Sequence, residues 1–394
     1  MHIALVKKHY SLRRGGAERY CVNLARGLMS LGHQVTVVGE RIDAELAGEV
    51  RFLPVRVWHA ASWAKNLSFA WNAAGVVRRS GCDVSIGLCP TMAVDLFRVT
   101  GRIHPYWMSI RYRNPLWRLV QEFNPRHQAI LHLEREIFER APSIQRVIVQ
   151  SQLERALVDD YYGVGPERVR VIYNGVDTKT FHPGVRAVSA AVRAELDIPR
   201  GAALLVFASV ADYSGKGLGS VIEALAKSTH RQTHLLVVGG ARSEPFVRQA
   251  ERLGVGKRVR FLPRQQQLER YLGAADLFVL PSIYEPFPNV NLEAMACGAP
   301  VLTTATSGGA DVIQEGANGY VVTNGFAVDE MVERIDRHLG ASMAFRAGMS
   351  QHCWEIAREL TVERNAACVA ELCQEVQAAR ASAPAAAPSE TCTA

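Results

Sequence analysis

Short apolar runs alternate with amphipathic helical patterns along most of the chain. The run at 3–6 (IALV) is typical of a buried parallel strand, and a polar loop and a helical pattern at 17–32 follow it. The next run, at 34–40 (QVTVVGE), completes a strand–helix–strand unit. Because such a crossover is right-handed, its natural product is a parallel sheet. Further strands of this sheet are expected at 82–88 and 146–151, with a helix at 152–162.

A second series of the same kind begins near Ala202. Its expected strands lie at 203–209, 234–240, 258–263, 276–282 and 300–304, and helical patterns separate them. Two successive series predict two doubly wound α/β domains that face each other across a cleft. The turn-rich segment 174–184 is typical of the linker between them. After residue 327 the pattern is mostly helical to about 380, and residues 381–394 are expected to be a disordered tail.

Composition narrows the class of protein without naming a function. The 394 residues are 48% hydrophobic and 21% charged, which is the range of a soluble globular protein. The net charge of +7 and the pI near 9.0 favour an acidic partner, which can be nucleic acid, a phosphorylated substrate or an anionic membrane surface. No nucleic-acid-binding motif accompanies the basic residues, so we expect no nucleic-acid partner.

Cysteine usage and hydropathy bear on location. Eight cysteines are scattered without a C-x-x-C pair, which favours reduced thiols in a cytosolic protein over disulfides or a zinc site. No signal peptide is visible, and no apolar run approaches the roughly 20 residues that a spanning helix needs. We therefore expect a cytoplasmic protein that would meet a membrane only from one side.

Strand-to-helix loops are where chemistry is expected, because ligands of open α/β sheets sit at the carboxyl ends of strands. In the first loop, Gly15 and Gly16 would let the backbone approach an anion at a helix N-terminus, although two glycines can equally make a simple turn. In a second loop, Lys216 stands between two glycines, where its ammonium could meet a phosphate or remain in solvent. A Gly-rich turn at 306–313 is expected to fix backbone geometry.

The most informative loop is YEPFPNVNLEAMACGAP, at 284–300. Glu293 falls in the first helical turn, where it could accept hydrogen bonds from the paired hydroxyls of a ribose. Glu285, eight residues earlier, could reach a second hydroxylated group, although each acid alone could be an ordinary turn residue. The prolines have no N–H, so the amides left to face a diphosphate at the helix start are those of Phe287, Asn289, Val290 and Asn291.

Together these residues resemble the retaining glycosyltransferases of family 4, which have the GT-B fold. The resemblance spans nearly the whole chain and rests on GGAER (15–19), VIYNGVDTKTFHP (171–183), GKGL (215–218), YEPFPNVNLEAMACGAPVLTT (284–304), GGADVI (308–313) and NGYVV (318–322). It implies two facing Rossmann-like domains with an interdomain cleft and C-terminal helices that cross back to the first domain. The implied domains are an acceptor-binding domain of residues 1–178 plus about 350–380, and a nucleotide-sugar-binding domain of residues 179–349.

The resemblance also implies roles for individual residues. Glu285 would contact the donor sugar, Glu293 the ribose of the nucleotide and Lys216 the diphosphate. The implied donor-binding set is Gly15, Gly16, Lys216, Phe287, Asn289, Val290, Asn291, Leu292 and Glu293. Beside Glu285 and Lys216, Asp95 and His104 are candidate catalytic residues that would contact the acceptor or the donor sugar, or else serve a structural role.

One departure from the family concerns the phosphate clamp. Many members have an arginine just before the lysine or a few residues upstream, but none occurs here at 202–215. The clamp of Lys216 would then be either weaker or completed across the cleft by Arg13, Arg14 or Arg19.

Within the family, the chain is most similar to the enzymes that add glucose to the first heptose of the lipopolysaccharide inner core. The likeness includes a basic and aromatic segment at 97–126, where Arg98 and Arg102 are candidates for contacting the acceptor or its phosphate. Such a segment suits a phosphorylated, lipid-anchored acceptor, or else is ordinary basic surface. The implied reaction transfers glucose from UDP-glucose with retained anomeric configuration, at the inner face of the cytoplasmic membrane.

Two other functions stay open from the sequence. A nucleotide-sugar 2-epimerase of the same fold would consume its substrate without an acceptor, and a non-catalytic sugar-nucleotide-binding protein would turn nothing over. The chain has no D-x-D carboxylate pair, so we expect neither a metal nor a cofactor. Positive loops and helix ends would then stabilise the diphosphate themselves.

Overall fold

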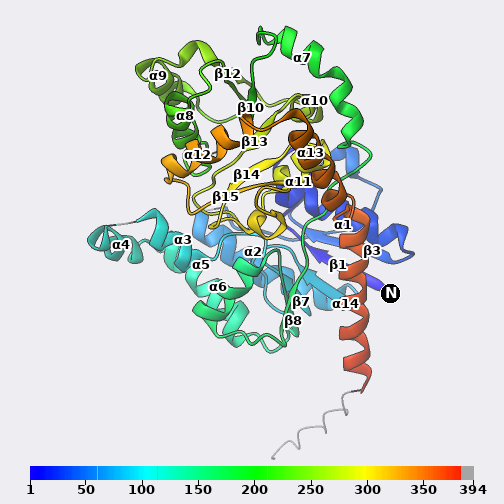
Figure 1. The fold of residues 1–394 in the computed structure, drawn as a ribbon. Helices are drawn as coiled ribbons and strands as arrows, with labels where there is room; N and C mark the ends of the chain where they lie inside the picture. Colours follow the sequence, from blue (N-terminus) through cyan, green and yellow to red (C-terminus); the bar gives the residue numbers. More distant parts are fainter. Residues whose placement is uncertain (60, 113, 211, 383–394) are drawn as a thin grey trace, which may run out of the picture.

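The computed structural model describes residues 1–382 except for 60, 113 and 211. In this part of the chain, two parallel sheets form two bodies, one above the other in Figure 1. Most of the tail that was expected to be disordered, residues 383–394, lies outside the described residues. Residues 381 and 382 are described as the end of a helix.

The first domain is built on a seven-stranded sheet in which every neighbouring pair is parallel. In sheet order its strands are β5 (Arg51–Pro54), β3 (Gln34–Gly39), β1 (His2–Val6), β6 (Val84–Gly87), β7 (Leu96–Arg98), β8 (Arg146–Val149) and β9 (Val169–Val171). Its helices are α1 (Gly16–Ser30), α2 (Ser62–Arg79), α3 (His104–Arg111), α4 (Pro115–Glu122), α5 (Pro125–Arg135) and α6 (Gln152–Tyr162). A short separate ladder joins β2 (His9–Tyr10) to β4 (Arg41–Ile42).

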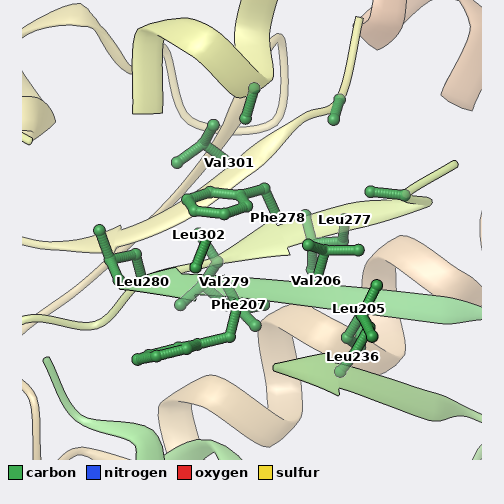
Figure 2. Packing of buried hydrophobic residues seen from close by; sticks show 14 of the residues in the cluster. Leu205, Val206, Phe207, Leu236, Leu277, Phe278, Val279, Leu280, Val301 and Leu302 are labelled. Carbon is green, nitrogen blue, oxygen red and sulfur yellow. The ribbon is translucent and has the colours of Figure 1, made fainter. Parts of the chain in front are cut away.

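The second domain has a six-stranded sheet that is also fully parallel. In sheet order its strands are β12 (Val259–Leu262), β11 (His234–Gly239), β10 (Leu204–Ser209), β13 (Leu277–Val279), β14 (Val301–Thr304) and β15 (Gly319–Val322). Its helices are α7 (Ser189–Glu195), α8 (Leu218–Lys227), α9 (Glu244–Arg252), α10 (Leu268–Gly273), α11 (Asn289–Ala296), α12 (Val328–Leu339) and α13 (Met343–Ala357). Figure 2 shows side chains such as Phe207 and Phe278 between these layers, where they are fully buried.

The last helix, α14 (Val362–Ser382), returns to the first domain, as predicted, and runs down its side in Figure 1. Ala366, Val369 and Cys373 are buried in the same core as residues of α1. The two helices approach closely at Gly27, where an added β-carbon would lie 2.5 Å from the β-carbon of Ala366. A glycine at this position therefore permits the contact.

Two segments that connect the domains lie side by side. Val176 N donates to Leu360 O at 2.8 Å, and Val362 N donates to Val176 O at 3.2 Å. Cys353, on α13, is buried in the core of the second domain, whereas α14 belongs to the first. The return crossing therefore lies at residues 358–361, between α13 and α14, instead of near residue 350.

Candidate donor and acceptor sites

Lys216 and Glu285 meet at the carboxyl ends of β10 and β13. Lys216 Nζ donates to Glu285 Oε2, and the two side chains are only 15% and 21% exposed. The loops that carry them touch at Gly217, where an added β-carbon would lie 2.3 Å from Pro281 O. Gly217 also has a left-handed φ of 80°, which favours glycine. The arrangement puts a cation beside a carboxylate. The Lys216 ammonium could bind a diphosphate, and the Glu285 carboxylate could accept a hydrogen bond from a sugar hydroxyl.

Arg102 approaches the same carboxylate from the first domain. It follows β7, and its Nη2 lies 4.0 Å from Glu285 Oε2 and 3.7 Å from Asp212 Oδ2. Asp212 belongs to the loop of Lys216, and its Oδ1 accepts the Gly215 amide at 2.9 Å. Arg102 is therefore an arginine of the first domain that approaches the partner of Lys216. From the sequence, either the clamp was weaker or Arg13, Arg14 or Arg19 completed it.

Arg13 forms its ion pair within the first domain. The Arg13 guanidinium is 77% exposed and pairs with Glu45 of its own domain. Arg14 is exposed on the same loop. The loop does contact the second domain through its backbone, because Arg264 Nη1 donates to Arg13 O at 2.7 Å.

Tyr284, directly before Glu285, joins the two domains beside the site. Its hydroxyl accepts a hydrogen bond from Ile103 N at 3.1 Å, and its ring meets Tyr106 edge-on at 4.9 Å. The ring is buried with core residues of the first domain. This contact was not predicted from the sequence. Only the position of Tyr284 next to Glu285, in the motif, could have drawn attention to it.

Helix α11 begins at Asn289, so the amides of Asn289 and Val290 lie in its first turn, where helical amides lack intrahelical partners. The Asn291 amide donates to Pro288 O at 3.1 Å, so the amides of Asn289 and Val290 are the more available donors. The side chains of Phe287 and Leu292 are buried in the core of the second domain. Their contribution to a donor site could come only from backbone groups.

Glu293 lies where α11 faces α1. Its carboxyl is 13% exposed, and Arg19 Nη1 lies 3.8 Å from Glu293 Oε1. Burial raises the pKa of Glu293, and the charge of Arg19 partly offsets the increase. Gly16, the first residue of α1, is close to α11, since an added β-carbon would lie 3.6 Å from Asn289 Nδ2. The structure thus brings Gly16 of one domain to the helix of Glu293 in the other, and Gly15 directly precedes it.

A buried polar network lies behind this contact. Asn174 Nδ2 donates to Asn289 Oδ1 at 2.5 Å and to Gln150 Oε1 at 3.0 Å. Arg98 donates to Asn174 Oδ1, and its guanidinium lies 3.6 Å from the centre of the Tyr20 ring. Arg98 is 2% exposed, so it supports the domain interface and is not part of an acceptor-binding surface.

Asp95 also has a structural position. It lies before β7, at the amino edge of the sheet, opposite the edge where ligands bind. Asp95 Oδ2 accepts Ser85 N at 2.7 Å, and Asp95 Oδ1 accepts Arg380 of α14. The carboxylate therefore fastens α14 to the sheet, and the expectation that Asp95 contacts a sugar is not supported by its location.

His104 lines a pocket of about 780 Å³ in the first domain. The ring is 8% exposed and stacks on Trp107 at 5.4 Å. Arg102 lines the same pocket, and its Nη2 is the atom that lies 4.0 Å from Glu285 Oε2. Cationic groups around this pocket include Lys7, Lys8, Arg102, Arg111 and Arg126, and its acids include Glu18 and Glu134.

Two searches of the described residues concern metals and membranes. Among residues 1–59, 61–112, 114–210 and 212–382, no group of three or more His, Cys, Asp or Glu side chains is placed to hold a metal ion. Over the same residues, every helix is too short or too polar to cross a bilayer.

Comparisons with known proteins match both halves of the chain. Residues 14–180 match the family described as Glycosyltransferase Family 4, and residues 189–352 match Glycosyl transferases group 1. Each match covers most of one of the two domains, and both family models describe glycosyltransferases. The two matches are separated by residues 181–188, which follow the first domain, and the second match ends within α13.

Curated relatives include glycosyl-transferring proteins from bacteria. A probable transglycosylase of Burkholderia thailandensis is 28% identical over 335 residues, which cover 82% of this chain and 84% of that protein. A D-inositol 3-phosphate glycosyltransferase of Mycobacterium sp. (strain KMS) is 33% identical over 220 residues, which cover 54% of this chain and 48% of that protein. The chain thus spans about half the length of the mycobacterial relative.

Solved structures confirm the predicted GT-B fold of the chain. WaaG, a glycosyltransferase involved in lipopolysaccharide biosynthesis, has a TM-score of 0.79 at 23% identity, covering 94% of this chain and 99% of that one. HepE of Anabaena, solved with UDP and glucose, has a TM-score of 0.72 at 20% identity, covering 95% of this chain and 100% of that one. At these identities the likeness establishes the fold.

Proposed function

We propose that this protein is a retaining, metal-independent glycosyltransferase that moves glucose from UDP-glucose to a hydroxyl of a phosphorylated inner-core heptose of lipopolysaccharide, or of a similar glycolipid. The observation that carries the proposal is the meeting of Lys216, Glu285 and Arg102 between the two domains, because two cations and a carboxylate are the charges that a sugar diphosphate would need. The two glycosyltransferase family matches support the reaction class.

A bound donor would replace the ion pair between Lys216 and Glu285 with contacts to its own diphosphate and sugar. Its diphosphate would take Lys216 from Glu285, with the first-turn amides of α11 and the helix dipole nearby. Glu285, released, would accept hydrogen bonds from the sugar, and Glu293 from the ribose. Positive charge at the leaving diphosphate stabilises the transition state, in which the anomeric carbon becomes cationic.

The choice of donor and acceptor is supported by comparison. HepE of Anabaena has been solved in complex with UDP-glucose, and WaaG acts in lipopolysaccharide biosynthesis. Lys7, Lys8 and Arg111 around the pocket of His104 are a suitable environment for a phosphorylated acceptor, because they can neutralise its charge. The pocket lies in the domain opposite Lys216, and a donor and an acceptor would thus meet in the cleft.

Helix α4 supports contact with a membrane. Asn114 caps it, Pro115 opens it, and in Figure 1 it lies at the outer end of the first domain. Large apolar side chains on and just after this helix are more than half exposed, namely those of Leu116, Trp117, Leu119, Val120 and Phe123. An apolar patch of this kind beside Arg111, Arg118 and Arg126 fits the headgroup region of an anionic bilayer. We therefore place the enzyme peripherally on the cytoplasmic face of the membrane.

The test is to incubate the protein with UDP-, GDP- and ADP-sugars and with truncated lipopolysaccharide cores, followed by mass spectrometry and NMR of the products. We expect transfer of glucose from UDP-glucose to a phosphorylated heptose, with retained configuration and no effect of EDTA. Transfer to other acceptors alone would contradict the lipopolysaccharide assignment. Turnover of a UDP-N-acetylhexosamine without acceptor would indicate an epimerase, and binding without turnover a non-catalytic protein.

A further inference from the structure

Another pocket lies in the second domain, at the edge of its sheet that is opposite to the donor site. Its volume is about 540 Å³, within the range of small-molecule sites. Ala202 and Ala203 line it directly before β10, and Asp276 lines it directly before β13. Lys216 and Glu285 follow the other ends of the same two strands. Because β10 has six residues at about 3.3 Å each, roughly 20 Å of strand separates this pocket from the donor site.

The pocket is lined by arginines from separate elements. Arg193 is on α7, Arg231 lies between α8 and β11, and Arg346 is on α13. Arg346 is only partly exposed, and its guanidinium makes no hydrogen bond or ion pair with any residue that the structure describes. Arg231 Nη1 donates to Ala226 O at 2.8 Å, and no carboxylate of the described residues pairs with it. Two of the three arginines therefore keep an uncompensated charge.

The acids of this region already have other partners. Asp276, which lines the pocket, accepts Arg193 Nη2 at 2.8 Å and the Leu204 amide at 2.7 Å. Asp336 is near His230, another residue of the pocket, but its oxygens accept the hydroxyls of Ser228 and Thr229. Neither carboxylate forms an ion pair with Arg231 or Arg346.

Neighbouring side chains respond to the two free arginines. Burial lowers the pKa of Arg258, and the charge of Arg231 lowers it further. Burial also lowers the pKa of His338; the hydrogen bond to Asp276 O opposes this effect, and the charge of Arg346 adds to it. Like charges held near one another disfavour the charged form of each. An anion in the pocket would remove this repulsion.

A buried hydroxyl beside these cations lacks a partner. Thr233 lines the pocket and is 1% exposed, and its Oγ1 makes no hydrogen bond within the described part of the chain. Buried polar groups are usually hydrogen-bonded, so an atom without a partner needs an explanation. A hydroxyl can donate to an anionic oxygen, as the guanidinium groups of Arg231 and Arg346 can.

We propose that this pocket binds a small molecule that carries phosphate. A phosphate monoester has close to two negative charges at neutral pH and three strong acceptor oxygens, which suit two arginine forks and a hydroxyl. The ligand would be separate from the nucleotide sugar, because the two sites lie at opposite edges of one sheet. The inference does not depend on glycosyl transfer, and a failure of the proposed function would leave it intact.

Calorimetric titration of the full chain with pyrophosphate tests the proposal. Pyrophosphate should also bind at Lys216, so we expect two sites in the unsubstituted protein and one in Lys216→Gln. Adding Arg231→Gln and Arg346→Gln to Lys216→Gln should weaken the remaining site by at least about tenfold, because charge-assisted hydrogen bonds are lost. Arg358→Gln, at an exposed arginine directly after α13, is the matched control and should leave both sites unchanged.

Equal binding by Lys216→Gln with and without the two arginine substitutions would overturn the proposal. Equal weakening by Arg358→Gln would overturn it too, since pyrophosphate would then be attracted to the basic surface in general. A single site that persists in Lys216→Gln and disappears with the arginines would support this pocket and contradict the donor site. Circular dichroism checks the fold. If Arg346→Gln does not fold, unchanged binding by Arg231→Gln, at an exposed side chain, would overturn the proposal.

Discussion

Arg102 is the residue whose position changes the account of the donor site most. It reaches Glu285 and Asp212 from the opposite domain, so its charge is available to a diphosphate held by Lys216. We expect Arg102→Ala to raise the KM of the nucleotide sugar about tenfold, because a charge-assisted hydrogen bond contributes on the order of 1.5–3 kcal/mol. Arg13→Ala should leave the KM of the donor unchanged, since Arg13 pairs with Glu45. Steady-state kinetics on both variants measure the difference, and equal values would contradict the role of Arg102.

Glu154 predicts a pH dependence of stability. The side chain is fully buried, and burial raises its pKa from the ordinary 4.5 to about 8, although the Gln150 amide donates to it at 2.7 Å. Between these two values the folded protein holds a proton that the unfolded chain releases. Stability should therefore fall as pH rises through this window, by on the order of 1 kcal/mol per pH unit.

Glu154→Gln removes this titration and keeps the shape of the side chain. We expect its melting temperature to exceed that of the unsubstituted protein at pH 8 and to match it at pH 5. Calorimetry at several pH values checks the expectation. Parallel melting curves for the two proteins at all pH values would show that Glu154 is ionised in the folded state.

Single residues also show where sequence reasoning stops. The motif at 284–300 drew attention to Glu285 and Glu293 because its spacing is local, and the two acids pair with Lys216 and Arg19. Their contacts with a donor stay predictions. The structural roles of Asp95 and Arg98 could not be predicted from local spacing. Their partners are Arg380 and Asn174, far along the chain, and only the return of α14 and the crossing between the domains bring these groups together.

At the scale of elements, α4 predicts membrane binding. Trp117 and Phe123 expose large apolar surfaces beside basic residues, and transfer of such side chains into the headgroup region is favourable. Trp117→Asp with Phe123→Asp should weaken binding to vesicles that contain anionic lipid by at least about tenfold, because burying two carboxylates is costly. Met343→Asp, at an exposed methionine of α13 in the other domain, is the control. Vesicle co-sedimentation that is equal for all three proteins would contradict docking through α4.

The contact between α1 and α14 predicts a loss of stability on overpacking. A side chain at residue 27 would collide with Ala366, so Gly27→Val should destabilise the protein by about 1–3 kcal/mol and expose α14 to limited proteolysis. Gly348→Ala should not, because an added β-carbon there meets no atom within 4 Å. Melting temperatures and proteolysis rates of the two variants make the comparison. A native melting temperature for Gly27→Val would show that α14 can shift without cost.

At the scale of the whole molecule, the sequence predicted most of the architecture. Apolar runs identified β1, β3, β10, β11 and β14 because buried parallel strands are continuously apolar. β7 and β9 went unrecognised, because each is three residues long and includes an arginine, whereas the equally short β13 lies in a longer apolar run. The sequence also did not predict that the chain returns to the first domain at residues 358–361. α13 and α14 are both helical, and which core each one joins depends on packing between distant segments.

The central claim is that the ion pair of Lys216 and Glu285 marks the site of hexose transfer. The most direct measurement is kcat for transfer of glucose from UDP-glucose by Glu285→Gln, compared with kcat of the unsubstituted protein. The melting temperatures of the two proteins should be equal, which shows that the substitution leaves the fold intact. The account predicts that kcat falls by at least about 100-fold. Glutamine can accept hydrogen bonds, but it lacks the negative charge that positions Lys216 and stabilises the cationic sugar of the transition state. Full turnover by Glu285→Gln would contradict it.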